Sequence, residues 1–190
     1  MPVITVTLIE GYDEATRERL AKGLTQVAQT VIGAPLDGVT VALHELKPAN
    51  YMRGGRQRTP GKAPTPPSTI VQSYLTAMEA RDLKAASQWL AKDACLTFPG
   101  GKTFTTLDTM IAWAQTRYRH IAKSYERFDE AGTEDGAVVI CQGTLHGEWL
   151  NGVGFDGIRF VDWFLIRDEM IMEQKVWNDL AETILNPAKG

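Results

Sequence analysis

Pro2 is the first residue of this chain whose type and position could support chemistry. Removal of Met1 would leave a secondary amine at the start of a strand-like stretch. A free α-amino group has a pKa of about 7.7–8.0, and an apolar site beside a cation lowers that pKa. A neutral amine near the working pH can accept a proton and return it elsewhere, so Pro2 is a candidate general base. Because proline makes up about 5% of average composition, a Met-Pro start alone is weak evidence for a catalytic proline. The residues around Pro2 must supply the stronger evidence.

Asp162 is the second candidate. It shares a strand face with Phe160 and Phe164, and if that face points inward, Asp162 is a carboxylate in apolar surroundings. Such an environment suits an acid or base catalyst. The alternative is an aspartate at a rim or dimer interface, paired with Arg159 or Lys175.

Strand, helix and strand patterns follow one another before residue 59. Val3–Ile9 alternates apolar residues with threonine, Asp13 is placed to cap a helix that Gly33 ends, and Val39–Leu46 predicts a second strand. A crossover of this length predicts two parallel strands. The unit is too small to bury a core alone, so we expect it to assemble with further copies. Its helix carries an apolar stripe formed by Leu20, Leu24, Val27, Ala28 and Val31.

Four prolines between residues 59 and 68 indicate a linker, because proline disfavours helix interiors and central strands. The expected domains are therefore 1–58 and 69–190. Helices followed by an antiparallel meander are typical of an α+β domain. The predicted fold is thus α+β, a small β-α-β unit followed by an α+β cone with a curved antiparallel sheet and helices. The helices expected after the linker are Thr69–Arg81, Leu83–Leu90, Leu107–Ile121 and a short one capped by Asp179, and the strands are Tyr125–Glu130, Ala137–Trp149, Phe155–Arg167 and Met170–Trp177.

Composition and charge argue against several classes of protein. The net charge of −3 divides into +2 for residues 1–67 and −5 for residues 68–190, and neither part has the basic patch with interleaved aromatics that nucleic acid requires. No apolar run reaches the roughly 20 residues of a membrane helix, and the N-terminus lacks signal-peptide features. Cys95 and Cys141 lack CxxC spacing, which favours the cytoplasm. His120 and His146 lack metal-ligand spacing, so we expect neither metal nor cofactor.

The stretch from PVITVTLIEG to NYMRGG resembles the 4-oxalocrotonate tautomerase family over residues 2–58. The shared features are the proline strand, its Glu10-Gly11 exit, the acidic helix start, the Ala34–Leu36 segment, the second strand and the Gly54-Gly55 hairpin. This resemblance implies β-α-β protomers that form dimers and then trimers or hexamers. It also implies enol–keto isomerisation of carboxylate-bearing substrates.

Two positions depart from the pattern of that family. Tyr12 stands where the family has an arginine after the Glu-Gly pair, and Thr40 replaces a second arginine. Those cations normally bind the substrate carboxylate. The aromatic position near the hairpin is kept as Tyr51, and we expect Arg53, or its neighbours Arg56 and Arg58, to supply the missing charge. Alternatively, these arginines form a solvated face ahead of the linker. Tyr12 could donate a hydrogen bond to a substrate carbonyl, or it could serve only to pack the turn between strand and helix.

Residues 68–186 resemble the nuclear transport factor 2-like superfamily, especially its SnoaL-like branch. The segments that carry this resemblance are STIVQSYLTAMEARDLKAASQWL, FPGGKTFTTLDTMIAW, GTLHGEW and IRFVDWFLIRDEMIMEQKVWND. The superfamily includes isomerases, dehydratases, polyketide cyclases and non-catalytic members. Its cone-shaped pocket commonly uses a buried carboxylate or histidine, which here implies Asp162.

Three functions follow from these observations. The first is a cofactor-independent tautomerase, an isomerase of a small unsaturated 2-oxo or 2-hydroxy acid, with Pro2 as base and Tyr12, Tyr51 and Arg53 binding substrate in a homo-oligomer. The second is a SnoaL-like cyclase or isomerase that uses Asp162, with the first domain serving oligomerisation. The third is a non-catalytic binder of small ligands.

Overall fold

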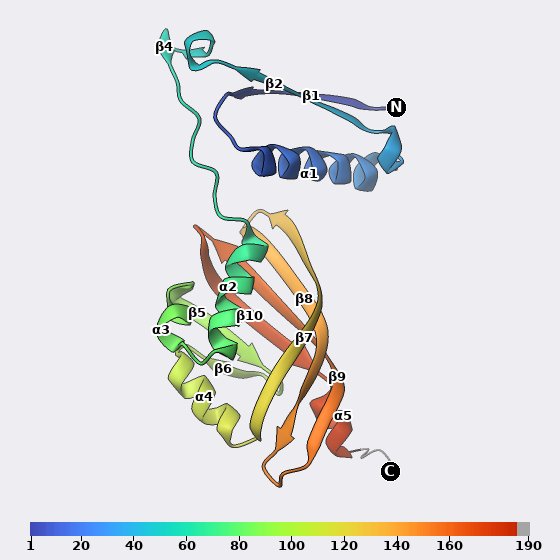
Figure 1. Ribbon diagram of the computed structural model, residues 1–190, viewed down its shortest axis with the longest axis vertical. Coiled ribbons are helices and arrows are strands. Elements are labelled where there is room, and N and C mark those ends of the chain that lie inside the picture. Colours follow the sequence, from blue (N-terminus) through green and yellow to red (C-terminus); the bar gives the residue numbers. More distant parts are fainter. Residues whose placement is uncertain (186–190) are drawn as a thin grey trace. The chain divides into compact units, whose positions relative to one another are not determined.

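The computed structural model describes residues 1–185, so the end of the expected second domain, 186–190, lies outside the described residues. The chain divides into two compact units, an N-terminal unit of residues Met1–Pro64 and a C-terminal unit that begins at Thr65. This division falls inside the segment 59–68 that was expected to be a linker. Figure 1 shows a β-α-β motif in the first unit and a curved sheet with helices in the second, as the predicted fold class required.

The N-terminal unit contains two parallel strands and the helix that connects them. Val3 pairs with Thr40 and Ile9 pairs with Leu46, in continuous register. The carboxylate of Asp13 accepts the N–H of Thr16 at 2.8 Å and caps the helix, as predicted. The elements of this unit are β1 (Val3–Ile9), α1 (Glu14–Ile32), η1 (Leu36–Gly38), β2 (Thr40–Leu46), η2 (Pro48–Asn50), β3 (Met52–Arg53) and β4 (Arg56–Gln57).

Most of the predicted apolar stripe on α1 is exposed in the N-terminal unit. Ala28 is its one buried member, whereas Val27 is 59% exposed and Val31 is 74% exposed. Two strands and one helix provide too little surface to cover that stripe. The expectation of an apolar face was right, but one copy does not bury it.

The C-terminal unit is built on a six-stranded sheet, whose strands lie in the order β6-β5-β10-β9-β8-β7. Strands β7 to β10 form the predicted antiparallel meander, and β5 extends the sheet by pairing parallel to β10. Helix α2 lies over this sheet (Figure 1). The elements are α2 (Pro67–Glu79), α3 (Leu83–Ser87), β5 (Leu90–Phe98), β6 (Lys102–Phe104), α4 (Leu107–Gln115), β7 (Tyr118–Thr133), β8 (Gly136–Trp149), β9 (Gly154–Arg167), β10 (Met170–Asn178) and α5 (Leu180–Leu185).

Several predicted boundaries in this unit are wrong. Helix α2 begins at Pro67, inside the expected linker, because the first helical turn does not need the missing proline N–H. Helix α4 ends at Gln115 rather than Ile121, since Tyr118 pairs with Trp149 in the sheet. Helix α3 ends at Ser87 because strand β5 starts at Leu90. Helix α5 does begin directly after Asp179, as predicted, but the side chain of Asp179 binds Arg159, and Asn178 accepts the N–H of Leu180 instead.

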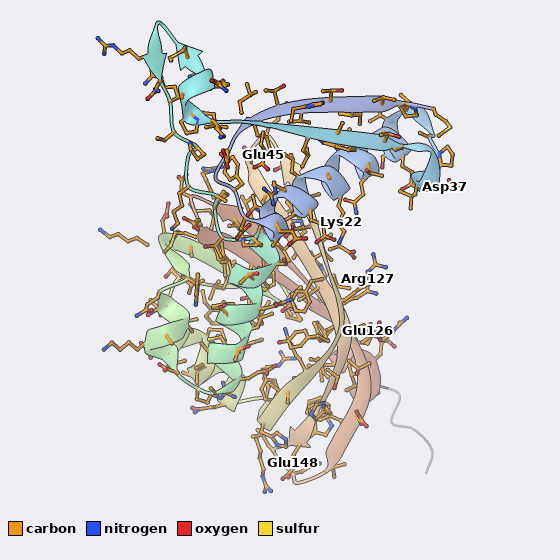
Figure 2. All side chains as sticks on the ribbon, turned by 45° about the horizontal axis from the view of Figure 1, so that its top comes forward. Lys22, Asp37, Glu45, Glu126, Arg127 and Glu148 are labelled. Carbon is orange, nitrogen blue, oxygen red and sulfur yellow. The ribbon has the colours of Figure 1, made fainter. Side chains whose placement is uncertain are left out.

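The curvature of the sheet depends on an interruption in the β7–β8 pairing. Glu126, labelled on β7 in Figure 2, is an extra residue, because its neighbours Tyr125 and Arg127 pair with consecutive residues of β8. Such a β-bulge bends its strand and increases the twist. A Cβ at Gly143 would lie 1.9 Å from the carbonyl oxygen of Ser124, so this position requires glycine. The missing side chain thus lets the backbones of β7 and β8 approach closely beside the bulge.

Candidate functional site

Pro2 lies at the start of β1 in the N-terminal unit. Its carbonyl oxygen accepts the N–H of Thr40 at 3.1 Å, which fixes the residue at the N-terminal end of the two-stranded sheet. Met1 before it is 94% exposed, so an aminopeptidase could reach the bond that it must cleave. Thr40, at the position where the related pattern has an arginine, is therefore a neighbour of Pro2 and brings no charge.

The other predicted residues of this site lie at the opposite end of the sheet. Tyr12 follows the end of β1, while Tyr51 and Arg53 follow the end of β2. Because β1 and β2 are parallel and each has seven residues, roughly 20 Å of strand separates Pro2 from all three. One copy of the chain does not bring the predicted tautomerase residues together.

Tyr12 borders a cleft with cationic side chains. Arg17, Arg19 and Lys62 line this cleft together with apolar residues of β1 and α1. Arg17 also binds Glu45 of β2 at 2.6 Å (Figure 2 labels Glu45). The Nη1 atom of Arg19 is buried and has no hydrogen-bond partner in the part of the chain that the structure describes. The cleft thus holds positive charge, whereas Arg53, where this charge was predicted, is exposed in the hairpin of β3 and β4.

The C-terminal unit contains a cavity of about 140 Å³ between α2, α4 and the inner face of the sheet. Its walls are mainly apolar, and Phe98 and Trp113 pack edge to face with ring centroids 5.5 Å apart. The other aromatic residues that line it are Tyr74, Tyr118, Tyr125 and Phe160. Trp113 and these residues make the wall of the cavity largely aromatic.

Asp162 lies on the inner face of β9, as its position between Phe160 and Phe164 predicted. Its side chain is completely buried and does not line the cavity, because Lys123 and Gln174 lie between. Lys123 donates a hydrogen bond to Asp162 Oδ2, and the Nε2 atom of Gln174 donates to the same oxygen at 3.3 Å. The Oδ1 atom of Asp162 is buried and has no hydrogen-bond partner among the described residues.

A set of hydrogen-bonded polar side chains, which we call the polar floor, lies at and beneath the cavity wall and includes Asp162. The hydroxyl of Tyr74 donates to Gln174 Oε1 at 3.1 Å, so Tyr74, Gln174, Asp162 and Lys123 form one chain of contacts. The Lys123 ammonium nitrogen also lies 4.5 Å from the ring centroid of Phe160, within cation–π range. A ligand in the cavity would therefore meet the ammonium group of Lys123 before it met the carboxylate of Asp162.

Burial dominates the electrostatics of this floor. It raises the pKa of the Cys141 thiol to about 12, and the negative charge of Asp162 adds to the effect. The pKa of Tyr74 is raised by burial and by Asp162 as well. For Tyr125, burial and then Glu79, which accepts its hydroxyl at 3.0 Å, raise the pKa. These groups stay protonated near neutral pH.

The alternative partners proposed for Asp162 are wrong. Arg159 pairs with Asp179 at 2.7 Å, and Lys175 pairs with Glu173 at the same distance. Lys123 was not among the predicted residues, because it lies two strands away from Asp162 in the sheet, and only the strand order and register bring the two together. Lys123 also fell between the helix expected to end at Ile121 and the strand expected to begin at Tyr125, so no local pattern marked it.

No group of three or more His, Cys, Asp or Glu side chains within residues 1–185 is arranged to hold a metal ion. Cys95 and Cys141 are both free thiols. None of the helices that the structure describes is long and apolar enough to cross a membrane.

Comparisons with known proteins separate the two units in the same way. Residues 2–58 match the family model for tautomerase enzymes, and residues 71–174 match the model for SnoaL-like domains. A "Probable tautomerase" from Ralstonia nicotianae is 38% identical over 64 residues, which cover 34% of this chain and 91% of that protein. The chain therefore belongs to the tautomerase family through its N-terminal unit and to the SnoaL-like family through its C-terminal unit.

Solved structures show the fold of the C-terminal unit. An NTF2-like protein of unknown function from Burkholderia pseudomallei has a TM-score of 0.54 at 23% identity, covering 62% of this chain and 94% of that one. TerC, crystallised with polyporic acid, has a TM-score of 0.55 at 17% identity, covering 64% of this chain and 97% of that one. At these identities the likeness extends to the fold alone.

Proposed function

We propose that the N-terminal unit is a cofactor-independent tautomerase of a small unsaturated 2-oxo or 2-hydroxy acid, with Pro2 as general base. The observation that carries this proposal is the tautomerase match, which begins at Pro2 itself. After removal of Met1, the neutral nitrogen takes the proton of the enol hydroxyl group and returns it to carbon. The C=C–OH group becomes CH–C=O, and no atoms are gained or lost.

The position of Pro2 supports a site shared between copies of the chain. Pro2 and the residues Tyr12, Tyr51 and Arg53 lie at opposite ends of the parallel strands, so a second copy with reversed strand direction would bring its Tyr51 close to Pro2. Exposed apolar residues of the N-terminal unit favour such an assembly, since Val3 is 68% exposed and Val31 is 74% exposed. We therefore propose a homo-oligomer built on a dimer.

The substrate carboxylate needs a cation, and the two candidates that we favour are Arg53 and Arg19. Arg53 follows the kept aromatic position Tyr51, as expected from the sequence. Arg19 lies beside Tyr12, and its buried Nη1 atom has no partner among the described residues. A carboxylate would satisfy this donor by a charge-assisted hydrogen bond. Alanine variants at the two positions would show which arginine binds the substrate.

The experiment measures ketonisation of 2-hydroxymuconate and of phenylpyruvate enol by the full chain. Intact-mass analysis must first show that Met1 is absent. An extra residue before Pro2 blocks the nitrogen, and we expect kcat/KM to fall about 100-fold or more, within the range of general acid–base catalysis. The matched control is Pro48→Ala in η2, which should leave activity unchanged. Retention of Met1, or full activity with a blocked nitrogen, would disprove the role of Pro2.

A further inference from the structure

We infer that the cavity of the C-terminal unit binds a small ring-bearing anion, such as an aryl carboxylate or phenolate, whose negative group contacts Lys123. This inference does not depend on the tautomerase activity proposed for the N-terminal unit. It assigns to Lys123, rather than to Asp162, the direct contact with the ligand. Asp162 is then a positioning residue, which acts through Lys123.

The donors of Lys123 are the first argument. An ammonium group has three N–H donors, and one of them binds Asp162. The Lys123 side chain is 19% exposed and lines the cavity, whereas the Asp162 side chain is completely buried. The remaining donors are therefore available to a ligand that enters the cavity.

The charge around the cavity is the second argument. Arg81, Arg117 and Lys123 line it, against the single carboxylate of Glu79. Even with the charge of Asp162 beneath Lys123, the positive groups exceed the negative ones by one. Glu79 is also engaged by the hydroxyl of Tyr125. An anion is thus favoured over a cation or a neutral molecule of the same shape.

The walls and the size indicate a single ring. Phe98, Trp113 and Phe160 present aromatic surfaces, which favour edge-to-face or offset contact with another ring. The cavity volume of about 140 Å³ is close to the size of an apolar cavity that accepts one benzene molecule. A monocyclic acid fits these limits better than a fused polycyclic one.

The ligand test uses two fluorinated probes and measures their dissociation constants by fluorine NMR on the full chain. One is 3-(4-fluorophenyl)propionate, and the other is its neutral amide, which has nearly the same shape. We expect the carboxylate to bind about tenfold more tightly, because a hydrogen bond to a charged group is the stronger one. Hexanoate, which lacks the ring, should compete poorly. No carboxylate binding up to about 10 mM, or equal binding of acid and amide, would overturn the inference.

Variants then locate the site. Removing Lys123 alone would leave Asp162 buried without its cation, so the informative variant is the double substitution Lys123→Met with Asp162→Asn. We expect it to abolish the preference for the acid while changing amide affinity by less than about twofold. Lys102→Met, at an exposed lysine of β6, is the matched control and should keep the preference.

Pro2→Ala separates this site from the proposed tautomerase site. It should leave the binding of both probes unchanged, even though it impairs ketonisation. A preference for the acid that survives in the double variant, or that disappears in Pro2→Ala, would place the anion elsewhere and overturn the inference. The comparison of acid with amide on the unaltered chain tests it even if the double variant does not fold.

Discussion

The two units differ in where their apolar side chains lie. In the C-terminal unit Val139, Phe164 and Ile171 are completely buried, and helix and sheet enclose one core. In the N-terminal unit Val27 and Val31 remain more than half exposed on α1. The C-terminal unit completes its core within one copy of the chain, whereas the N-terminal unit leaves these apolar residues of α1 uncovered. The two units therefore differ in how much of their apolar surface one copy of the chain covers.

The candidate sites differ in the same way. The cavity with Lys123 and Asp162 is formed by one C-terminal unit, so a single copy suffices for it. Pro2 and Tyr51 lie at opposite ends of parallel strands, so the proposed tautomerase site needs two copies. Oligomerisation should therefore govern ketonisation but leave ligand binding by the cavity unchanged.

Removing a core side chain from the C-terminal unit should have the largest effect on stability. Phe164→Ala deletes a completely buried ring that packs against Tyr74 with ring centroids 6.2 Å apart. We expect the free energy of unfolding to fall by about 3–5 kcal/mol, independently of protein concentration. Urea denaturation at two protein concentrations measures both the change in the free energy of unfolding and its independence of protein concentration. Trp177→Ala, at a 56% exposed residue, is the control and should change it by about 0.5 kcal/mol or less.

Local patterns in the sequence predicted much of this fold because they report local structure. Strand β1 has the predicted bounds, since alternation begins at Val3 and Gly11 interrupts it after Ile9. The extent of α4 was overestimated because its helical periodicity runs on into residues that pair in β7. Asp162 was placed on the inner face by its aromatic neighbours. Its partner Lys123 depends on strand order and register, which no local pattern contains.

The next largest effect should be that of dilution, which should lower the stability of the N-terminal unit but not that of the C-terminal unit. For residues 1–64 produced alone as a dimer, a 100-fold dilution should lower the apparent free energy of unfolding by about 2.7 kcal/mol, because folding depends on association. Residues 65–190 should show no such dependence. Thermal unfolding with analytical ultracentrifugation measures this difference. The same concentration dependence of unfolding in both fragments would contradict the proposal that only the N-terminal unit depends on assembly.

Alkaline pH should destabilise the C-terminal unit by a smaller amount. Burial raises the pKa of Cys141 to about 12, above the pKa of an exposed thiol, so the folded state holds this proton more tightly. The resulting stability is complete below the pKa of the unfolded thiol and is lost as pH rises toward the folded value. Between pH 8 and pH 10 the loss should be about 1.4–1.9 kcal/mol for an unfolded thiol pKa of about 8.5–9. Urea denaturation should show a flatter profile for Cys141→Ala, and an unchanged slope would contradict this account.

The smallest effect should come from the ion pair of the N-terminal unit. Arg17 on α1 and Glu45 on β2 are 2.6 Å apart, with side chains 34% and 27% exposed. Partial exposure leaves the charges screened by water, so their coupling energy should be about 0.2–1 kcal/mol. A double-mutant cycle with Arg17→Ala and Glu45→Ala measures this energy, and about 1 M salt should weaken it further. A coupling much above this range would mean that assembly buries the pair, and would place this edge of the sheet inside the interface.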